Sequence, residues 1–560
     1  MTTAALMDFV YFVVLVGILV FVHELGHFTV AKLSGVVVQR FSLGFGPRLT
    51  GFRIGETEYV LAAIPLGGYV RMLGERPGDV IHEAANGRSF HEQPLLRRMA
   101  IVFAGPAMNL VLPLGLFFVV SFSDATISPA VIGTVFPGRP ADGRLLAGDE
   151  VQAVDGVAVT TFREVSRVID ANVGRPLTLR ILRRGQPIDE VLTPVLTRRV
   201  RELGRVEEVG RVGIMPHHPM PVVGVFSPHG AAAQAGLRTF DRVLTVAGQS
   251  VDRYVDLTRA LDRRRGAIVP LTYLRPARIP RALGGLVELE LYTPHVATLS
   301  LATGGSDAAL AAGLEPSDLY VRSVRVGSAE QSAGLRPGDR IVALDGHPVR
   351  LWSTFVLDLQ AGGAHTHQLL YRRGEQLRVA HYALGVERGV TPDGQRFERY
   401  AIGLEHWLPM RLDPGVPNPH RLADAVRGAF TSTREMVELT VLSVVRLLEG
   451  EVSMKSIGGP LTIFDVAGTA ARSGLPDYLT VMAFISVNLG LINLLPIPML
   501  DGGHLLFFLV EGVTRRRISR RVREYASLVG LVLLLLLMGL ALKNDIERHW
   551  PSPDQESSAR

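Results

Sequence analysis

The stretch FVYFVVLVGILVFVHELGH, from Phe9 to His27, joins an apolar run to three ionisable residues in its last five positions. The run from Phe9 to Val22, with the residues that follow it, is long enough for a bilayer, which takes about 20 mostly apolar residues. An ionisable residue inside a membrane helix costs at least ~2.5 kcal/mol, so such residues are usually kept for a function. A polar cap at a helix end is the plainer alternative. We expect a membrane helix that carries a functional site.

The spacing of HELGH indicates the kind of site. Residues four positions apart share one face of a helix, so His23 and His27 can bind one metal ion together. Two imidazoles at this spacing, with Glu24 beside them as general base, are typical of a Zn²⁺ site. A catalytic zinc ion usually has three protein ligands and an open position, so a third ligand is needed from elsewhere in the chain.

A second informative stretch, NLGLINLLPIPMLDGGH, offers that ligand near the end of another apolar segment. Asp501 and His504 are both candidates. Pro496 and Pro498 should break the helix before Asp501, and backbone groups freed in this way are tolerated at membrane depth only within protein or beside water. A broken helix that presents a carboxylate suits a metal site, although this reasoning leaves both candidates open.

Three further segments are uncharged and long enough to span a membrane: Met99–Ser123, Tyr478–Leu500 and Ala526–Leu542. The first span is not expected to be a cleaved signal peptide. The residues before it include Asp8 but no Lys or Arg, whereas a signal peptide begins with a positively charged region. A mean hydropathy of +0.25 with 20% charged residues indicates spans combined with water-soluble modules. The absence of cysteine excludes disulfides, thiolate metal sites and cysteine nucleophiles.

Lys and Arg near the ends of spans predict the orientation. The loop between the third and fourth spans contains the Arg-rich stretch Arg515–Arg523, and the loop between the first two spans is also rich in basic residues. Both loops should therefore be cytoplasmic, which places both termini and the long central region on the other side. The net charge of +6 then reflects membrane topology, and the expected partner is a lipid bilayer with no nucleic acid.

The central region contains an internal repeat. GDEVQAVDGVAV begins at Gly148, FDRVLTVAGQSV at Phe240 and GDRIVALDGHPV at Gly338. A second marker recurs as GIMP, GLEP and GLEH, so two independent signals share one period. Each unit runs from a strand through a small-residue turn and a short strand to a helix-like segment. The units resemble bacterial PDZ domains, which bind peptides by adding a strand to a sheet edge. A generic β-rich spacer is the alternative.

These signals predict a multi-pass α-helical membrane protein with four spans, a membrane-associated β-hairpin region and an inserted array of α+β PDZ-like domains. An amphipathic surface helix is expected at Ala429–Leu448. The segments are a first membrane part (1–123), three PDZ-like domains (124–216, 217–316 and 317–410), an amphipathic connector (411–477), a second membrane part (478–550) and a disordered tail (551–560).

With these elements in order, the chain resembles the site-2 proteases, in the branch of the bacterial regulator-of-sigma-E proteases. The matching motifs are HELGH, RFSLGFGP, IPLGGYVRM, AGPAMN, the PDZ region and SVNLGLINLLPIPMLDGGHLL. The resemblance implies zinc ligands at His23, His27 and Asp501 and a general base at Glu24. The asparagines that this family has within the membrane correspond to Asn109, Asn488 and Asn493 here, and these residues are expected to position the substrate. The branch typically has two PDZ domains, and three are expected here.

The resemblance also implies a function: Zn²⁺-dependent cleavage inside the spans of single-span proteins already trimmed by another protease. Anti-sigma factors or signal-peptide remnants are the expected substrates, and the bacterial inner membrane, with the PDZ domains and termini periplasmic, is the expected location. The segment Val36–Met72 is expected to be β-structure beside the zinc. The alternatives are a non-catalytic PDZ scaffold, disfavoured by the intact motifs, and a zinc transporter. A second metal site at His217, His218 and His229 is less favoured than a solvated linker.

Overall fold

The computed structural model describes residues 3–74, 88–123, 125–200, 206–282, 287–305, 307–362, 365–390, 396–450, 452–516 and 518–549. The chain divides into two compact units, and each is described by itself. The helical unit holds Met1–Ala125, Val390–Arg396 and Asn418–Arg560, and the repeat unit holds Thr126–Gly389 and Phe397–Pro417. The tail expected at 551–560 lies outside the described residues.

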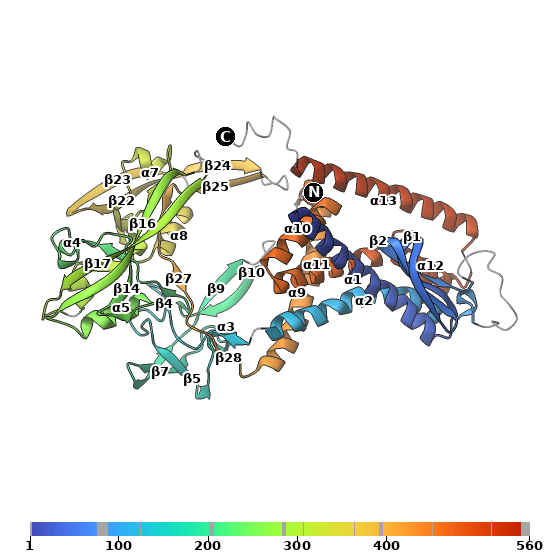
Figure 1. Ribbon diagram of the computed structural model, residues 1–560, viewed down its shortest axis with the longest axis horizontal. Coiled ribbons are helices and arrows are strands. Elements are labelled where there is room, and N and C mark those ends of the chain that lie inside the picture. Colours follow the sequence, from blue (N-terminus) through green and yellow to red (C-terminus); the bar gives the residue numbers. More distant parts are fainter. Residues whose placement is uncertain are drawn as a thin grey trace. The chain divides into compact units, whose positions relative to one another are not determined.

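Among the described residues, four helices are long and apolar enough to cross a membrane: α1 (Thr3–Leu33), α2 (Leu95–Ser123), α11 (Leu475–Leu494) and α13 (Arg520–His549) (Figure 1). They coincide with the four spans expected from the sequence. The third helix ends at Leu494 and not at Leu500, because Leu495 takes an extended backbone, with ψ 144°. A residue before proline is disfavoured in the helical region, so Pro496 ends the helix here.

Three further helices of this unit are α9 (Arg421–Glu449), α10 (Pro460–Ser473) and α12 (Asp501–Thr514). α9 contains the expected amphipathic segment but starts earlier in the sequence. Its residue Ala429 packs in one apolar cluster with Phe117 of α2 and Ala483 of α11. α10 lies within the helical connector expected at 411–477, whereas no separate helix was expected at α12, which directly follows the proline-rich break.

Two long strands between α1 and α2, β1 (Val38–Ile54) and β2 (Thr57–Met72), fold into one sheet. Both strands double back. Arg40 therefore lies opposite Arg71 on one side and opposite Glu58 on the other. Within the described residues, the segment 68–70 pairs on one side only, so it forms an edge of the sheet.

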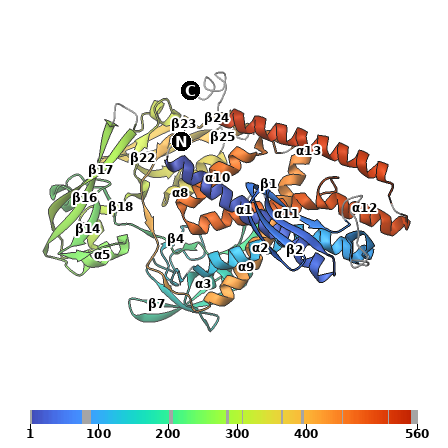
Figure 2. The same ribbon diagram turned by 45° about the vertical axis from the view of Figure 1, so that its right-hand side comes forward.

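This sheet is held against the helices by an apolar cluster. Phe41 and Val70 of the sheet pack with Ala31 of α1 and Ile101 of α2. Figure 2 shows the ribbons of β1 and β2 beside α1. The β-structure expected at Val36–Met72 thus packs directly on the helix that carries HELGH.

The repeat unit contains three similar α+β repeats, each with a four-stranded sheet and one helix of nine to eleven residues (Figure 1). The first repeat has β5 (Glu150–Val154), β6 (Val157–Ala158), α3 (Phe162–Ala171), β7 (Leu177–Arg183) and β8 (Gln186–Leu192). The second has β14 (Arg242–Val246), β15 (Gln249–Ser250), α5 (Tyr254–Asp262), β16 (Ile268–Ala282) and β17 (Val287–Ser300). The third has β20 (Arg340–Leu344), β21 (His347–Pro348), α8 (Trp352–Gly362), β22 (Thr366–Arg373) and β23 (Gln376–Ala383).

The second sequence marker has a structural counterpart in each repeat. GIMP, GLEP and GLEH hold the strands β11 (Ile214–Met215), β18 (Leu314–Pro316) and β26 (Leu404–Glu405). These strands pair with β4 (Thr134–Val135), β13 (Val223–Val225) and β19 (Ser323–Val324), which begin the same repeats. Each marker therefore closes its repeat by pairing with its first strand.

A buried ion pair recurs at the first marker. Asp149, Asp241 and Asp339 are at most 2% exposed, and each lies 2.7 Å from an arginine 34 residues later, at Arg183, Arg275 and Arg373. Each arginine also donates to the carbonyl of a residue in the preceding turn. The sequence repeat revealed the aspartates, whereas their arginine partners emerge only from the fold.

One expectation about histidines is wrong. His218 is not in a solvated linker, since its side chain is 1% exposed and its Nε2 lies 3.1 Å from Asp413 Oδ2. It lies in β12 (His218–Pro219), which pairs with β27 (Met410–Arg411). His229, by contrast, is exposed. The boundary expected at 411 is also too early, because the repeat unit extends to Pro417.

The repeated ion pair generates a stability prediction. Asp241→Ala should lower the free energy of unfolding by about 3–5 kcal/mol, because it leaves Arg275 without its buried counter-ion. Asp189→Ala removes an exposed pair with Arg180, which solvent screens, so it should leave the free energy of unfolding nearly unchanged. Denaturant unfolding of the full-length protein in detergent measures both, and equal effects would contradict a structural role for the buried pair.

Candidate metal centre

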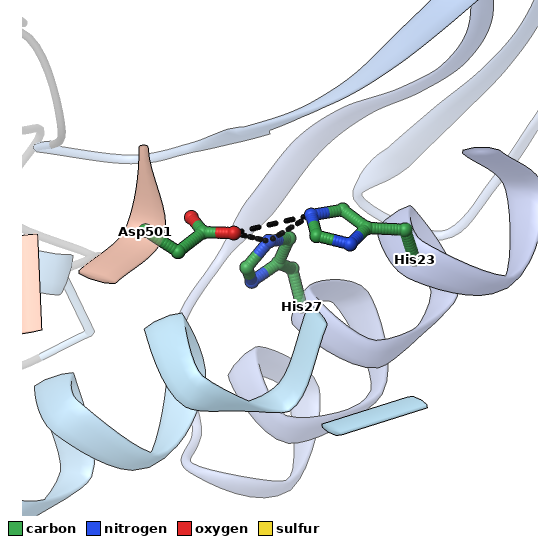
Figure 3. Close-up of side chains that lie close together, drawn as sticks. All are labelled: His23, His27 and Asp501. Atoms are coloured by element: carbon green, nitrogen blue, oxygen red, sulfur yellow. Dashed lines mark hydrogen bonds and ion pairs between the residues drawn. The ribbon is translucent and has the colours of Figure 1, made fainter. Parts of the chain in front are cut away.

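The two histidines of HELGH lie on one face of α1, within an uninterrupted helix. Their side chains are each 12% exposed, and the two Nε2 atoms are 3.2 Å apart. Figure 3 shows both imidazoles turned toward a single carboxylate, that of Asp501. The helical spacing therefore produces the shared face that the sequence predicts.

Asp501 reaches this face because the chain turns sharply before it. It is the first residue of α12, and the turn brings Asp501 Oδ2 to 3.1 Å from His23 Nε2 and 3.5 Å from His27 Nε2. The two glycines that follow are required by this turn. A Cβ atom at Gly502 or Gly503 would lie 2.2 or 2.4 Å from a backbone carbonyl oxygen.

The three ligand atoms fit a zinc ion. Their separations of 3.1 to 3.5 Å are close to the ~3.3 Å between ligand atoms of a tetrahedral zinc ion with bonds of about 2.0–2.1 Å. His504 lines the same cavity but does not belong to the group of ligand atoms within 4.8 Å that the described residues form. The geometry thus favours Asp501 over His504.

Contacts behind the ligands orient both imidazoles. His27 Nδ1 lies 2.8 Å from the carbonyl oxygen of Ile101, so Nδ1 donates and Nε2 is left to face the metal position. His23 Nδ1 lies 3.1 Å from the side-chain amide of Asn109, which is fully buried. Asn109 Oδ1 has no hydrogen-bond partner among the described residues. Turning this amide would let Oδ1 accept from His23 Nδ1, which satisfies both atoms.

α2 can approach the ligands this closely only through small residues. A Cβ atom at Gly105 of α2 would lie 2.3 Å from His27 Nε2 and 2.8 Å from His23 Nε2. A Cβ atom at Gly26 of α1 would lie 2.3 Å from the carbonyl oxygen of Ala104. The sequence analysis noted AGPAMN only as a matching motif, and the role of its glycine is a property of the packing.

α12 is anchored to α2 on the side of Arg98. This arginine is buried and donates to Glu511 of α12 at 2.9 Å, and its guanidinium lies 5.0 Å from the centre of the Phe508 ring. In the sequence this arginine is one of several basic residues between the first two spans, and its pairing with Glu511 emerges only from the fold. A buried ion pair between α2 and α12 holds the helix that begins with Asp501.

A cavity of about 1000 Å³ opens beside the ligands. Its lining includes Glu24 and also Tyr69 and Val70 at the edge of the sheet. Glu24 Cγ lies 3.0 Å from the position of a Cβ atom at Gly68, so the proposed base is adjacent to that edge. Of the expected substrate-positioning asparagines, Asn493 lines the cavity, whereas the described lining does not include Asn488.

Comparison with known proteins is consistent with this centre. The model of peptidase family M50 matches residues 11–537. The chain is 30% identical to the regulator of sigma-E protease RseP of Escherichia coli, over 97% of this chain and 99% of that protein. It is 31% identical to the protease RseP of Yersinia pestis, over 96% and 98%. A Vibrio cholerae protein with the name "Putative zinc metalloprotease" is 30% identical, over 98% of this chain and 100% of that protein.

The close approach of α2 predicts a selective loss of metal. Gly105→Ala should lower zinc affinity by at least about tenfold, because the added methyl group displaces the imidazoles from the metal position. Gly115→Ala, in the same helix, has open space around its Cβ position and should leave affinity unchanged. Zinc bound to each purified variant measures the effect, and a Gly105→Ala protein with normal affinity would show that the helices adjust without loss.

Proposed function

Because this chain belongs to peptidase family M50, it is a site-2-type zinc metalloprotease, and we propose that its substrates are single-span membrane proteins, cut within their membrane segments. The observation that carries the proposal is the convergence of His23, His27 and Asp501 beside a cavity that also contains Glu24. α1, which carries His23, Glu24 and His27, is long and apolar enough to cross a membrane, and so is α2 beside it. Peptide bonds within a membrane are thus the bonds that this centre can reach.

In this proposal His23, His27 and Asp501 hold the zinc ion. When bound there, Zn²⁺ supplies Lewis-acid chemistry, which acidifies a water molecule and polarises a carbonyl group. Glu24 takes the proton from the attacking water and passes it to the nitrogen of the departing amine. Asn109 orients His23, so we assign it a positioning role behind the ligands in place of the substrate contact expected from the sequence.

The edge of the sheet suits an extended substrate. A helical membrane segment hides its peptide bonds, so it must unwind before cleavage, and its freed backbone groups then need partners. The segment 68–70 offers backbone groups on one unpaired side and lies next to Glu24. A substrate strand added there would present its peptide bond to the base. Asn493 lines the same cavity and is the better placed of the two remaining asparagines for contact with it.

The biological substrate class follows from the relatives. The Escherichia coli relative is named a regulator of sigma-E protease, so we propose that this chain releases the cytosolic part of a membrane-bound anti-sigma factor, with signal-peptide remnants as a second class. The three repeats, proposed to be PDZ domains, would lie in the periplasm of an inner-membrane protein. There they would exclude substrates with an intact outer domain, so cleavage would follow trimming by another protease. The intact ligand set disfavours a non-catalytic scaffold.

The role of Glu24 is tested by a conservative change. Glu24→Gln should lower cleavage of a single-span reporter by at least roughly 10²–10⁴-fold, because glutamine cannot take the proton. Zinc content should remain normal, since Glu24 lies beside the ligand group without belonging to it. Asp501→Ala is the matched comparison and should lose zinc and activity together. Near-normal turnover by Glu24→Gln would remove Glu24 from the mechanism.

The size-filter role is tested by removing the repeats. Ile127 lies opposite Val416 in the pair formed by β3 (Thr126–Ile127) and β28 (Val416–Pro417), so residues 128–415 can be replaced by a short glycine-serine turn. The shortened protein should cleave untrimmed substrates that the full chain rejects. Zinc content and membrane insertion are checked first. If both proteins cleave only trimmed substrates, selection resides in the helical unit.

A further inference from the structure

A second group of metal-ligating side chains lies in the third repeat. Asp345 occupies the turn between β20 and β21, while His365 precedes β22 and His367 lies within it. One ligand atom from each residue lies within 4.8 Å of the other two. Asp345 Oδ2 is 2.7 Å from His367 Nδ1 and 3.6 Å from His365 Nε2, so both rings face one oxygen atom.

The contacts around this group leave ligand atoms available. His365 Nδ1 donates to the carbonyl oxygen of Gly362, the contact that fixes a ligating imidazole with its other nitrogen free. Asp345 Oδ1 accepts from the backbone amide of Gln368 at 2.7 Å, which leaves Oδ2 for a metal.

Comparison with the other two repeats shows that this group is specific to the third. Equivalent positions in the three repeats follow from one shared turn residue, which has φ near +50° and is Asp155, Ala247 or Asp345 in turn. The backbone amide of this residue donates to the carbonyl oxygen of Thr178, Pro270 or Gln368, respectively, so these three residues are also equivalent. The position of His367 is therefore occupied by Leu177 in the first repeat and Val269 in the second. Both are core residues at most 1% exposed, and His367 is equally buried.

An imidazole is an unfavourable replacement for these core residues. His367 Nε2 is buried with no hydrogen-bond partner among the described residues, and burying such an atom without a partner destabilises the fold. The equivalents of His365 are Arg175 and Ala267, so neither of the other repeats has a histidine there. Among the three repeats, the two histidines thus occur in the third alone, where they join an aspartate that the first repeat shares as Asp155.

We propose that Asp345, His365 and His367 bind a divalent transition-metal ion, with Zn²⁺ as the expected species. Two imidazoles and a carboxylate are a ligand set that zinc accepts, and no thiolate is available in this chain. The exposed side of His365 leaves the remaining coordination position open to solvent. The ion would connect the turn after β20 to the segment between α8 and β22, so its role is to stabilise the third repeat.

The distances are compatible with this role. The 3.6 Å contact is close to the ~3.3 Å expected between two ligands of one tetrahedral zinc ion, and the 2.7 Å contact is a hydrogen bond that the ion would replace. His365 is 55% exposed, so its ring can shift without disturbing the core.

The test is zinc titration of the purified full-length protein with metal analysis. The wild-type chain should bind one zinc ion beyond the catalytic one. His365→Ala should weaken binding of the second ion by more than roughly 10–100-fold, which is the loss expected when a residue that only hydrogen-bonds to a metal ligand is removed. His347→Ala changes an exposed histidine two residues from Asp345 and outside the group, so it should bind both ions. Asp501→Ala should lose only the catalytic ion, which separates the two sites.

His367→Leu separates metal binding from folding. Leucine occupies the equivalent position in the first repeat, so this variant should fold at least as well as the wild type and still lose the second ion. In the full-length protein, zinc should raise the midpoint of thermal unfolding of the repeat unit in the wild type but not in His367→Leu. A wild-type chain that binds only the catalytic ion, or a second ion retained by both His365→Ala and His367→Leu, would overturn the proposal.

Discussion

The helical unit depends on one convergence, in which a carboxylate from the C-terminal part of the chain meets two imidazoles on the first helix. Asp501 Oδ2 lies 3.1 Å from His23 Nε2, and the surrounding helices are arranged so that this distance can be kept. Ligands spread in this way must be positioned by packing, since no local spacing joins them. Three features fix the position of Asp501: the end of α11 before Pro496, the close turn at Gly502 and Gly503, and the ion pair between Arg98 and Glu511.

Close approach also explains the small residues around the centre. Gly105 lets α2 lie against the imidazoles, and the carbonyl of Ile101 and the amide of Asn109 on the same helix then reach their outer nitrogens. A single helix thus supplies both the space and the orientation for the ligands. On its other side the centre faces a cavity bordered by a sheet edge, so the groups proposed to perform hydrolysis and those proposed to hold an extended chain line one site.

In the repeat unit a buried Asp–Arg pair plays the corresponding role. It fixes the same turn in all three repeats, and each arginine also satisfies a carbonyl group in that turn. Because the framework is the same three times, a departure in one copy can be recognised. His367 of the third repeat occupies the position that Leu177 and Val269 occupy in the other two. This difference can be recognised only because the chain contains three copies of the fold.

The sequence by itself determined the spans, the shared face of His23 and His27 and the repeat period, because each depends on local spacing along the chain. Local reasoning left Asp501 and His504 as alternatives and the family resemblance implied Asp501, while the tertiary structure places Asp501 beside His23 and His27. The end of α11, the role of Gly105, the arginines that pair with the repeated aspartates and the burial of His218 were likewise decided by packing. The physical reason is common to them: each depends on atoms brought together from distant parts of the sequence, which no periodicity encodes.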